Sequence, residues 1–385
     1  MTRTRVAAFT PGPPKRTGGA VYAGVLLPAL ADHVDVVAVA PDPVDWDGPT
    51  IPPADFRPDD HDVVLHFLAD NTDHLFAYRS ALQWGGVVVC HELSLPHLLG
   101  STPADEALDL AEQLGAEGAA GVAHRRSRGL NTHQEAYLLQ VLGRPLRQAE
   151  AAVVHSRFSK FVVEAEVPGL PVHHVPSHTG AVPSDLEPKA ALRQRLGLDP
   201  DRFLVGLFGF LGGHKRVTET LQAVADAVPL ARARGVEVGL VLVGDAVMAD
   251  LAGTLAGLGL TDRAIVRTSV DERSFFEHMA AVDTLVTLRY PTLGETSATM
   301  LQAMALGQPV ITSDHAQFAE ERAAIRIPPD EGERATLARA LVVLATCPQC
   351  ASTAAETSRA RARECTLEAT TAGYLGVVES VLRAR

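Results

Sequence analysis

A glycine-rich loop that ends in two cations is the first feature that could do chemistry. The loop follows the apolar run Leu204–Phe208 and contains, in order, Gly209, Gly212, Lys215 and Arg216. Backbone N–H groups at the start of a helix favour anionic oxygens, and Lys215 adds a full positive charge. The spacing of a Walker loop is absent. Two interpretations stay open: a diphosphate-binding loop, or a solvent-exposed turn with ordinary charges.

A second loop places polar residues just before a predicted helix. It follows the apolar run Thr284–Leu288 and contains Arg289, Gly294, Glu295, Thr296 and Ser297. Thr296 and Ser297 could cap the helix, or the free N–H groups of its first turn could receive a phosphate. Glu295 and Gln302 would project from one face if the helix starts early enough, and they could then bind sugar and ribose hydroxyls. Plain capping and solvation is the alternative.

A histidine directly follows the apolar run Val87–Cys90. His91 therefore lies at the carboxyl end of a predicted strand, where open α/β sheets bind their ligands. It is either a structural residue or a catalytic or acceptor-contacting one. Glu92 could orient its imidazole or cap the next helix. Asn71 and His74 follow another apolar run and are weaker candidates for the same site.

Short apolar runs alternate with helical periodicity along the whole chain, and they predict the elements that carry these loops. The predicted strands of the first half are Val6–Phe9, Val34–Ala40, Val63–Phe67, Gly86–Cys90 and Ala151–His155. Those of the second half are Leu204–Phe208, Val238–Val243, Ala264–Val266, Thr284–Leu288 and Pro309–Thr312. Continuous apolar strands separated by helices are typical of parallel sheets covered on both faces. The predicted fold class is α/β, with two Rossmann-like, doubly wound parallel sheets.

A proline-containing segment without periodicity, residues 175–183, separates two halves of similar size. It reads as an interdomain linker, so we predict domains at 1–180 and 181–365. The candidate loops all follow the carboxyl ends of strands. They therefore predict a ligand-binding cleft between the two domains.

Composition and charge exclude several classes of protein. The chain has 385 residues, of which 46% are apolar and 21% charged, the balance of an ordinary soluble protein. Its formal net charge of −12 disfavours binding to a nucleic acid backbone or to an anionic membrane. The N-terminal apolar run is too short for a signal peptide, and no run reaches the length of a membrane-spanning helix. We expect a cytoplasmic protein.

Cys347 and Cys350 form an isolated Cys-x-x-Cys pair. A zinc site would need a second pair or histidines at ligand spacing. We interpret the two residues as helix-end thiols in a reducing compartment, and a metal or redox role is the alternative.

Taken together, these pieces carry a resemblance. The sequence resembles the retaining glycosyltransferases of family 4 (glycosyl transferases group 1), which have the GT-B architecture. The resemblance covers nearly the whole chain. Its parts are Gly18-Gly19, Val154-His155-Ser156, Gly209 to Lys215, Val243-Gly244-Asp245, Gly294-Glu295-Thr296-Ser297 and the block from Gln302 to Val310. Their order and spacing together are more specific than any one of them.

The resemblance implies roles for the C-terminal domain, which would bind a nucleotide-diphosphate sugar. Lys215 would contact the diphosphate, and the N–H groups around Thr296 and Ser297 would hold the distal phosphate. Glu295 would reach the donor sugar, and Gln302 would face the nucleotide ribose. No metal and no further cofactor is implied.

It also implies roles for the N-terminal domain, which would bind the acceptor. Gly18 and Gly19 would close over the phosphate, and His91 would lie near the anomeric carbon. The last helix, Leu367 to Leu382 within 366–385, would cross back onto this domain.

Three positions, Glu295, Gln302 and Phe210, depart from the family's pattern. The second of its two usual glutamates is Gln302, and the first lies one position late, at Glu295. Phe210 replaces a frequent arginine. Glutamine binds a hydroxyl as a neutral group, with less strength. Diphosphate binding would then depend on Lys215, Arg216 or Arg289.

The implied function is transfer of a sugar, with retention, from a nucleotide-diphosphate sugar to an acceptor hydroxyl. Its transition state resembles an oxocarbenium ion. The net negative charge of the chain favours a small soluble or natural-product acceptor. The alternatives are an acceptor in cell-surface glycan synthesis, a non-catalytic GT-B partner protein, or another GT-B enzyme such as an epimerase or a phosphorylase.

Overall fold

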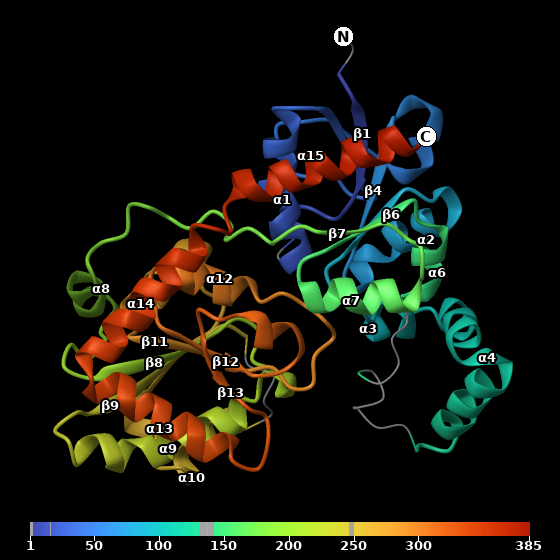
Figure 1. Ribbon diagram of the computed structural model, residues 1–385. Coiled ribbons are helices and arrows are strands. Elements are labelled where there is room, and N and C mark those ends of the chain that lie inside the picture. Colours follow the sequence, from blue (N-terminus) through green and yellow to red (C-terminus); the bar gives the residue numbers. More distant parts are fainter. Residues whose placement is uncertain (1–2, 16, 131–136, 138–141, 246–249) are drawn as a thin grey trace. The chain divides into compact units, whose positions relative to one another are not determined.

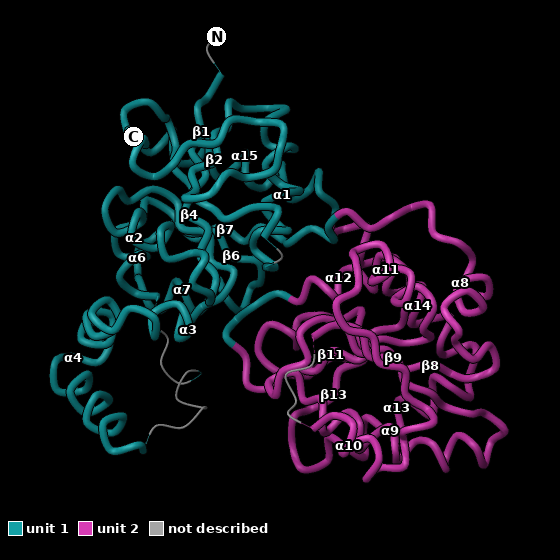
Figure 2. Tube along the Cα trace, turned by 180° about the vertical axis from the view of Figure 1, so that it is seen from behind, with its two compact units in different colours: residues 1–180, 293–296, 366–385 teal, residues 181–292, 297–365 magenta. Residues whose placement is uncertain are grey.

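The computed structural model describes residues 3–15, 17–130, 137, 142–245 and 250–385 (Figure 1). These fall into two compact units (Figure 2). Unit 1 consists of Met1–Gly180, Leu293–Thr296 and Thr366–Arg385, and unit 2 of Ala181–Thr292 and Ser297–Cys365. The sequence places residues 293–296 in the second domain, whereas the structure groups them with unit 1.

Unit 1 alternates strands and helices. Its strands are β1 (Arg5–Phe9), β2 (Asp35–Val39), β3 (Thr50–Ile51), β4 (Val63–Leu68), β5 (Val87–Cys90), β6 (Ala151–Val154) and β7 (Val172–His174). Its helices are α1 (Gly18–Ala31), α2 (Leu75–Trp84), α3 (Pro96–Gly100), α4 (Pro103–Ser127), α6 (Gly143–Gln148), α7 (Arg157–Glu166) and α15 (Leu367–Ala384). Among the described residues, the sheet has seven parallel strands in the order β3-β2-β1-β4-β5-β6-β7. The strand order reverses between β1 and β4.

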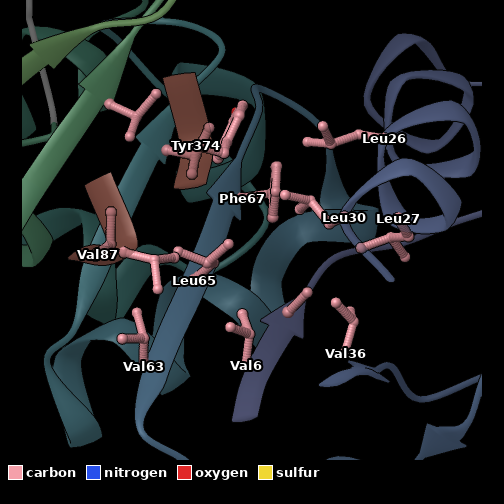
Figure 3. Packing of buried hydrophobic residues seen from close by; sticks show 14 of the residues in the cluster. Val6, Leu26, Leu27, Leu30, Val36, Val63, Leu65, Phe67, Val87 and Tyr374 are labelled. Atoms are coloured by element: carbon pink, nitrogen blue, oxygen red, sulfur yellow. The ribbon is translucent and has the colours of Figure 1, made fainter. Parts of the chain in front are cut away.

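Helices α1 and α15 cover one face of this sheet (Figure 1). Leu26 and Leu30 of α1 and Tyr374 of α15 are buried against the strands (Figure 3). The Tyr374 ring stacks on Phe67 of β4 at 6.0 Å, and its hydroxyl donates to or accepts from Tyr22 at 3.2 Å. Full burial of one such side chain stabilises the fold by about 1.5–3 kcal/mol, so α15 is part of the unit 1 core.

Unit 2 repeats the pattern. Its strands are β8 (Phe203–Phe208), β9 (Val238–Val243), β10 (Ala264–Arg267), β11 (Thr284–Thr287), β12 (Val310–Ser313) and β13 (Ile325–Ile327). Its helices are α8 (Lys189–Leu196), α9 (Val217–Arg232), α10 (Leu251–Gly257), α11 (Glu272–Ala281), α12 (Ala298–Ala305), α13 (Glu333–Thr346) and α14 (Pro348–Ala362). In the described part of unit 2 the parallel order is β10-β9-β8-β11-β12-β13. The prediction of two doubly wound parallel sheets is confirmed.

The differences from the predicted elements lie at the edges. The sequence misses the short strands β3, β7 and β13, which have two or three residues each. All three are edge strands, which lack a continuous apolar run because one side is not covered by a neighbouring strand. The sequence predicts a helix over Val217–Val228 after the glycine-rich loop, and α9 continues through Pro229 to Arg232, four residues beyond that end.

A disulfide joins Cys347 to Cys350 at the junction of α13 and α14. The interpretation of this pair as reduced thiols therefore differs from the structure. Cys347 ends α13 and caps α14, and its sulfur accepts the Cys350 N–H at 3.2 Å. Three residues of separation on one turn bring the two sulfurs together.

Among the described residues, no single helix is long and apolar enough to cross a bilayer. One pair of helices, Glu333–Thr346 and Pro348–Ala384, is long and apolar enough when the two are taken together, but the pair is bent by 103°.

Candidate functional site

Gly209 ends β8 and lies between two groups predicted to bind an anion. Its φ is +83°, in the left-handed region that favours glycine. A Cβ atom there would lie 3.1 Å from Nζ of Lys215 and 3.6 Å from Cγ2 of Thr299. The amine of Lys215 and the first turn of α12 therefore meet at the end of β8. The structure brings together two loops that the sequence predicts separately.

The loop itself is held by backbone hydrogen bonds. The N–H of Gly209 donates to the Val243 carbonyl at 2.9 Å, which anchors the loop to β9. The Lys215 N–H donates to the carbonyl of Gly212 at 3.0 Å and closes a short turn, Gly213–Lys215. Lys215 Nζ also donates to the Phe208 carbonyl at 3.4 Å, so its stem folds back over the strand end.

Three hydroxyl groups gather at the start of α12. Ser297 caps the helix by accepting the Met300 N–H at 3.3 Å, which confirms the capping interpretation for this residue. Its Oγ also lies 3.1 Å from the hydroxyl of Thr299 and 3.4 Å from that of Thr287. Helix N-termini and hydroxyl donors both favour anionic oxygens, so capping and anion binding are compatible here.

Arg289 is the second cation of this group. Its side chain is buried, and its guanidinium donates to the Thr287 hydroxyl at 3.2 Å and to the Leu288 carbonyl at 2.9 Å. The Arg289 N–H donates to the hydroxyl of Ser313 at 2.9 Å. Through Thr287, Arg289 belongs to the same hydroxyl network as Ser297. We call Lys215, Arg289, Thr287, Ser297 and Thr299 the anion group.

Arg216 points elsewhere. Its guanidinium binds the carboxylate of Glu333 through two nitrogens, and the Glu333 side chain is buried. The guanidinium also lies 5.8 Å above the ring of Tyr290. The sequence gives no sign of this ion pair, because the two residues are far apart in the chain. Arg216 as a diphosphate cation stays a prediction.

The condition for a shared helical face of Glu295 and Gln302, an early start of the helix, is not met. Helix α12 begins at Ala298, so Gln302 is helical and Glu295 is not. Ser297, whose backbone is extended, is the N-cap, and Gly294 before it has a φ of +87°. Thr296 likewise precedes the helix.

The segment Leu293–Thr296 packs within unit 1. The Leu93 N–H donates to the Leu293 carbonyl at 2.6 Å, and the Ser159 hydroxyl donates to the Gly294 carbonyl at 3.4 Å. A Cβ on Gly294 would lie 2.5 Å from Leu93, so only glycine fits. Glu295 accepts the Leu293 N–H at 2.9 Å through Oε2.

His91 belongs to a cluster of rings in unit 1. It stacks on His155 at 5.2 Å and meets Tyr22 edge-on at 4.9 Å, while His178 stacks on Tyr22 at 4.4 Å. His74 lies 6.5 Å from His91. The Nε2 atoms of all four histidines are buried without a hydrogen-bond partner among the described residues. The sequence predicts His91 and His74 but misses Tyr22, His155 and His178 as their neighbours.

Burial keeps these imidazoles neutral. It lowers the pKa of His74, His155 and His178 to about 4, and the pKa of His91 well below its usual value. The Nδ1 atoms of His74 and His155 bond the carbonyls of Phe67 and Val175 at 2.7 and 2.9 Å, so a neutral ring presents Nε2 as an acceptor.

Glu92, the residue after His91, lies near the carboxylates of Glu295 and Asp70. Its Oε2 accepts the Asp70 N–H at 3.1 Å. Burial, and then the carboxylates of Glu295 and Asp70, raise the pKa of Glu92 to about 8. Glu92 is therefore largely protonated at neutral pH.

The remaining predicted residues lie at the start of α1 and after β4. Gly18 is the first residue of α1, and a Cβ on Gly19 would lie 2.7 Å from Nε2 of His74. Asn71 caps a short turn by accepting the Asp73 N–H at 3.1 Å. Across the described ranges, no three His, Cys, Asp or Glu side chains are grouped as metal ligands would be.

One protein-family model matches the chain. Residues 206–346 match the model described as "Glycosyl transferases group 1", and they contain the whole anion group. A search of curated protein sequences found no significant match.

Several solved structures have the same fold. HepE from Anabaena, solved with UDP-glucose, has a TM-score of 0.69 at 16% identity over 98% of this chain and 100% of its own. Sucrose-phosphate synthase from Thermosynechococcus elongatus has a TM-score of 0.67 at 18% identity over 100% of both chains. WaaG, a glycosyltransferase involved in lipopolysaccharide biosynthesis, has 0.65 at 14% over 97% and 99%. These likenesses, with the two parallel sheets, show the two-domain Rossmann-like fold of the GT-B type.

Proposed function

We propose that this chain is a retaining glycosyltransferase of the family 4 type, which moves a sugar from a nucleotide-diphosphate sugar to an acceptor hydroxyl. The observation that carries the proposal is the anion group. It lies wholly within residues 206–346, which match the model for glycosyl transferases group 1. Similar structures have been solved with UDP and with UDP-glucose, so a UDP-sugar is the first donor to test.

The anion group suits a departing diphosphate. As the bond to the sugar breaks, negative charge builds on the leaving group. Lys215 and Arg289, with the start of α12, stabilise that charge more in the transition state than in the ground state. The carbon that is left resembles an oxocarbenium ion. A phosphate oxygen on the same face takes the acceptor proton, which gives retention and needs no metal.

Unit 1 would supply the other predicted residues. His91 presents a neutral imidazole, which can accept a hydrogen bond from a sugar hydroxyl without placing a positive charge beside the cationic carbon. Glu295 would contact the donor sugar. Gln302 of α12, which belongs to unit 2, would bind the ribose. Gly18 and Gly19, at the start of α1, would close over the phosphate. The acceptor would bind to unit 1.

A second candidate is a GT-B protein that binds but does not catalyse. Two observations favour it: Gln302 is neutral where the family commonly has glutamate, and Phe210, in the glycine-rich loop, is 58% exposed. A partner protein of this kind would release no nucleotide.

The test is calorimetric and enzymatic titration with UDP and UDP-sugars, using Lys215→Ala and the matched control Lys160→Ala on the exposed face of α7. We expect Lys215→Ala to lower turnover by at least a hundredfold and to leave the unfolding transition unchanged. Lys160→Ala should behave as wild type. Normal turnover in Lys215→Ala would refute the diphosphate assignment, and nucleotide binding with no turnover on any acceptor would favour the partner protein.

A further inference from the structure

Two adjoining hollows open in unit 1 where its strand order reverses. The larger has a volume of about 490 Å³ and the smaller about 290 Å³. The larger is lined by Lys15 after β1, Asp42 after β2 and Asp73 after β4. In an open parallel sheet, the point between strands that continue in opposite directions is where ligands bind, and here that point lies between β1 and β4. The sequence predicts none of these three residues.

The two hollows share a wall. Lys15, Pro41, Asp42 and Phe76 line both of them. The rest of the smaller hollow is apolar and rigid, formed by Pro11, Gly12, Pro14, Ala40 and Pro43. Proline has a fixed φ, so this wall is formed before a ligand arrives. Together the hollows have the size and the mostly apolar lining of a small-molecule site.

Backbone contacts hold the loops that form this wall. The Asp45 N–H donates to the Pro13 carbonyl at 2.7 Å and ties the loop after β2 to the loop after β1. The Lys15 N–H donates to the Gly12 carbonyl at 3.2 Å. A Cβ on Gly12 would lie 2.3 Å from Val44, so the loops pack too closely for any larger residue.

Each of the two cations that line the hollows in the described part of the chain forms an ion pair with a carboxylate. Lys15 Nζ binds Asp73 at 2.8 Å and Asp42 at 3.2 Å, and the hydrogen bond to Asp73 is the main reason that the pKa of Lys15 is raised. Arg79, the other lining cation among the described residues, binds Asp105 at 3.2 Å. A phosphate would need unmatched positive charge, so this site disfavours it. The carboxylates of Asp42 and Asp73 can still accept hydroxyl hydrogens.

Aromatic side chains provide the second half of the recognition. Phe76 lines both hollows, and Trp84, the last residue of α2, lines the larger one and is 43% exposed. Phe76 lies in the first turn of α2, next to Asp73, whereas Trp84 lies about 15 Å away at the other end of the helix. An aromatic side chain beside carboxylates, such as Phe76, binds a ring by its face while the carboxylates bind the hydroxyls.

We propose that the paired hollows bind an uncharged acceptor that combines a flat apolar ring with hydroxyl groups, and that they reject phosphorylated acceptors. The apolar ring lies against Phe76, which lines both hollows, and the hydroxyls donate to Asp42 and Asp73. That the ligand is the acceptor rests on the function proposed above. The binding itself does not.

The probe is phenyl β-D-glucopyranoside, titrated into the full chain without a donor and followed by saturation-transfer-difference NMR. Phenyl phosphate is the charged comparison. We expect saturable binding of the glucoside only. Its Kd should rise about tenfold in Asp73→Asn, which weakens a hydrogen bond to a charged group, and by a similar factor in Phe76→Leu. Asp59→Asn and Phe161→Leu, which change an exposed carboxylate and an exposed ring elsewhere in unit 1, should bind as wild type.

The proposal is overturned if the glucoside does not bind, if Asp73→Asn and Phe76→Leu bind it as tightly as wild type, or if phenyl phosphate binds equally well. UDP titration of the same samples separates this result from the proposed function. Loss of glucoside binding with normal UDP binding counts against the hollows alone. Failure of wild type to bind any nucleotide counts against the glycosyltransferase and leaves the glucoside result standing.

Discussion

The guanidinium of Arg216 donates through Nε to both carboxylate oxygens of Glu333, at 2.7 and 2.6 Å, across 117 residues of chain. The Glu333 side chain is only 2% exposed, whereas that of Arg216 is 20% exposed. Arg216 therefore neutralises a buried carboxylate at the start of α13. This role competes with the diphosphate contact that the sequence predicts.

Replacing Arg216 by methionine should destabilise unit 2 by about 3–5 kcal/mol, because it leaves a buried carboxylate without its partner. The double variant Arg216→Met with Glu333→Leu should recover most of that loss, since a buried ion pair is often replaceable by apolar residues. Urea unfolding measures both. We expect the affinity of the double variant for nucleotide to stay within about threefold of wild type. A hundredfold loss of nucleotide affinity in the double variant would instead support a contact between Arg216 and the diphosphate.

The histidine cluster should make the fold sensitive to acid. The pKa of His155 and His178 is about 4 in the folded protein and about 6.5 when unfolded. Between these values the unfolded chain binds more protons, so stability is full above pH 6.5 and falls as the pH drops toward 4. The loss should be about 1–2 kcal/mol for each histidine at pH 5. Unfolding titrations of His178→Gln should show a shallower fall, and His33→Gln, which changes an exposed histidine, should match wild type. Parallel curves for His178→Gln and wild type would contradict this.

Glu92 should have the opposite effect on the pH dependence of stability, because it lowers the stability of the fold as the pH rises. Its pKa is raised to about 8 by burial and by Glu295, against about 4.5 when unfolded. Between these values the folded protein holds a proton that the unfolded chain has lost, so this contribution to stability is full at low pH and is lost as the pH rises toward 8. Glu92→Gln should therefore be more stable than wild type at pH 8, by on the order of 2 kcal/mol, and equal to it near pH 4.5. Equal stabilities at pH 8 would show that Glu92 is ionised in the fold.

Gln302→Glu tests the departure from the family's pattern on α12. A carboxylate accepts a hydroxyl hydrogen more strongly than an amide does. We expect the variant to bind UDP about fivefold more tightly, as measured by calorimetry. The control is Gln349→Glu, because the Gln349 side chain is exposed. Gln308→Glu is not suitable, since the Gln308 side chain donates to the Ala280 carbonyl at 3.1 Å. Unchanged or weaker UDP binding in Gln302→Glu would place the ribose elsewhere.

The sequence predicts the strands well where both faces are buried, as in β4, whose six residues are all buried. It predicts His91 and Lys215 because each follows such a strand. It misses residues whose partners come close only when the chain is folded: Glu333 beside Arg216, Tyr22 among the histidines, and Lys15 between Asp42 and Asp73. Their partners lie far away in sequence, so no local spacing indicates them. The start of α12 at Ala298 agrees with the sequence, in which Ser297 directly precedes the helical stretch and caps it.

The order of segments in unit 1 limits how this protein can be engineered. The chain passes from one unit to the other four times, after residues 180, 292, 296 and 365. A chimera that joins residues 1–180 to a foreign second half would lack α15, and with it the Tyr374 ring that fills the core beside Phe67. One proteolytic cut after residue 180 would likewise leave residues 293–296 and α15, which belong to unit 1, on the fragment that carries unit 2. Exchanging unit 2 between relatives therefore requires transplanting residues 181–292 and 297–365 as two inserts, with the four residues between them left in place.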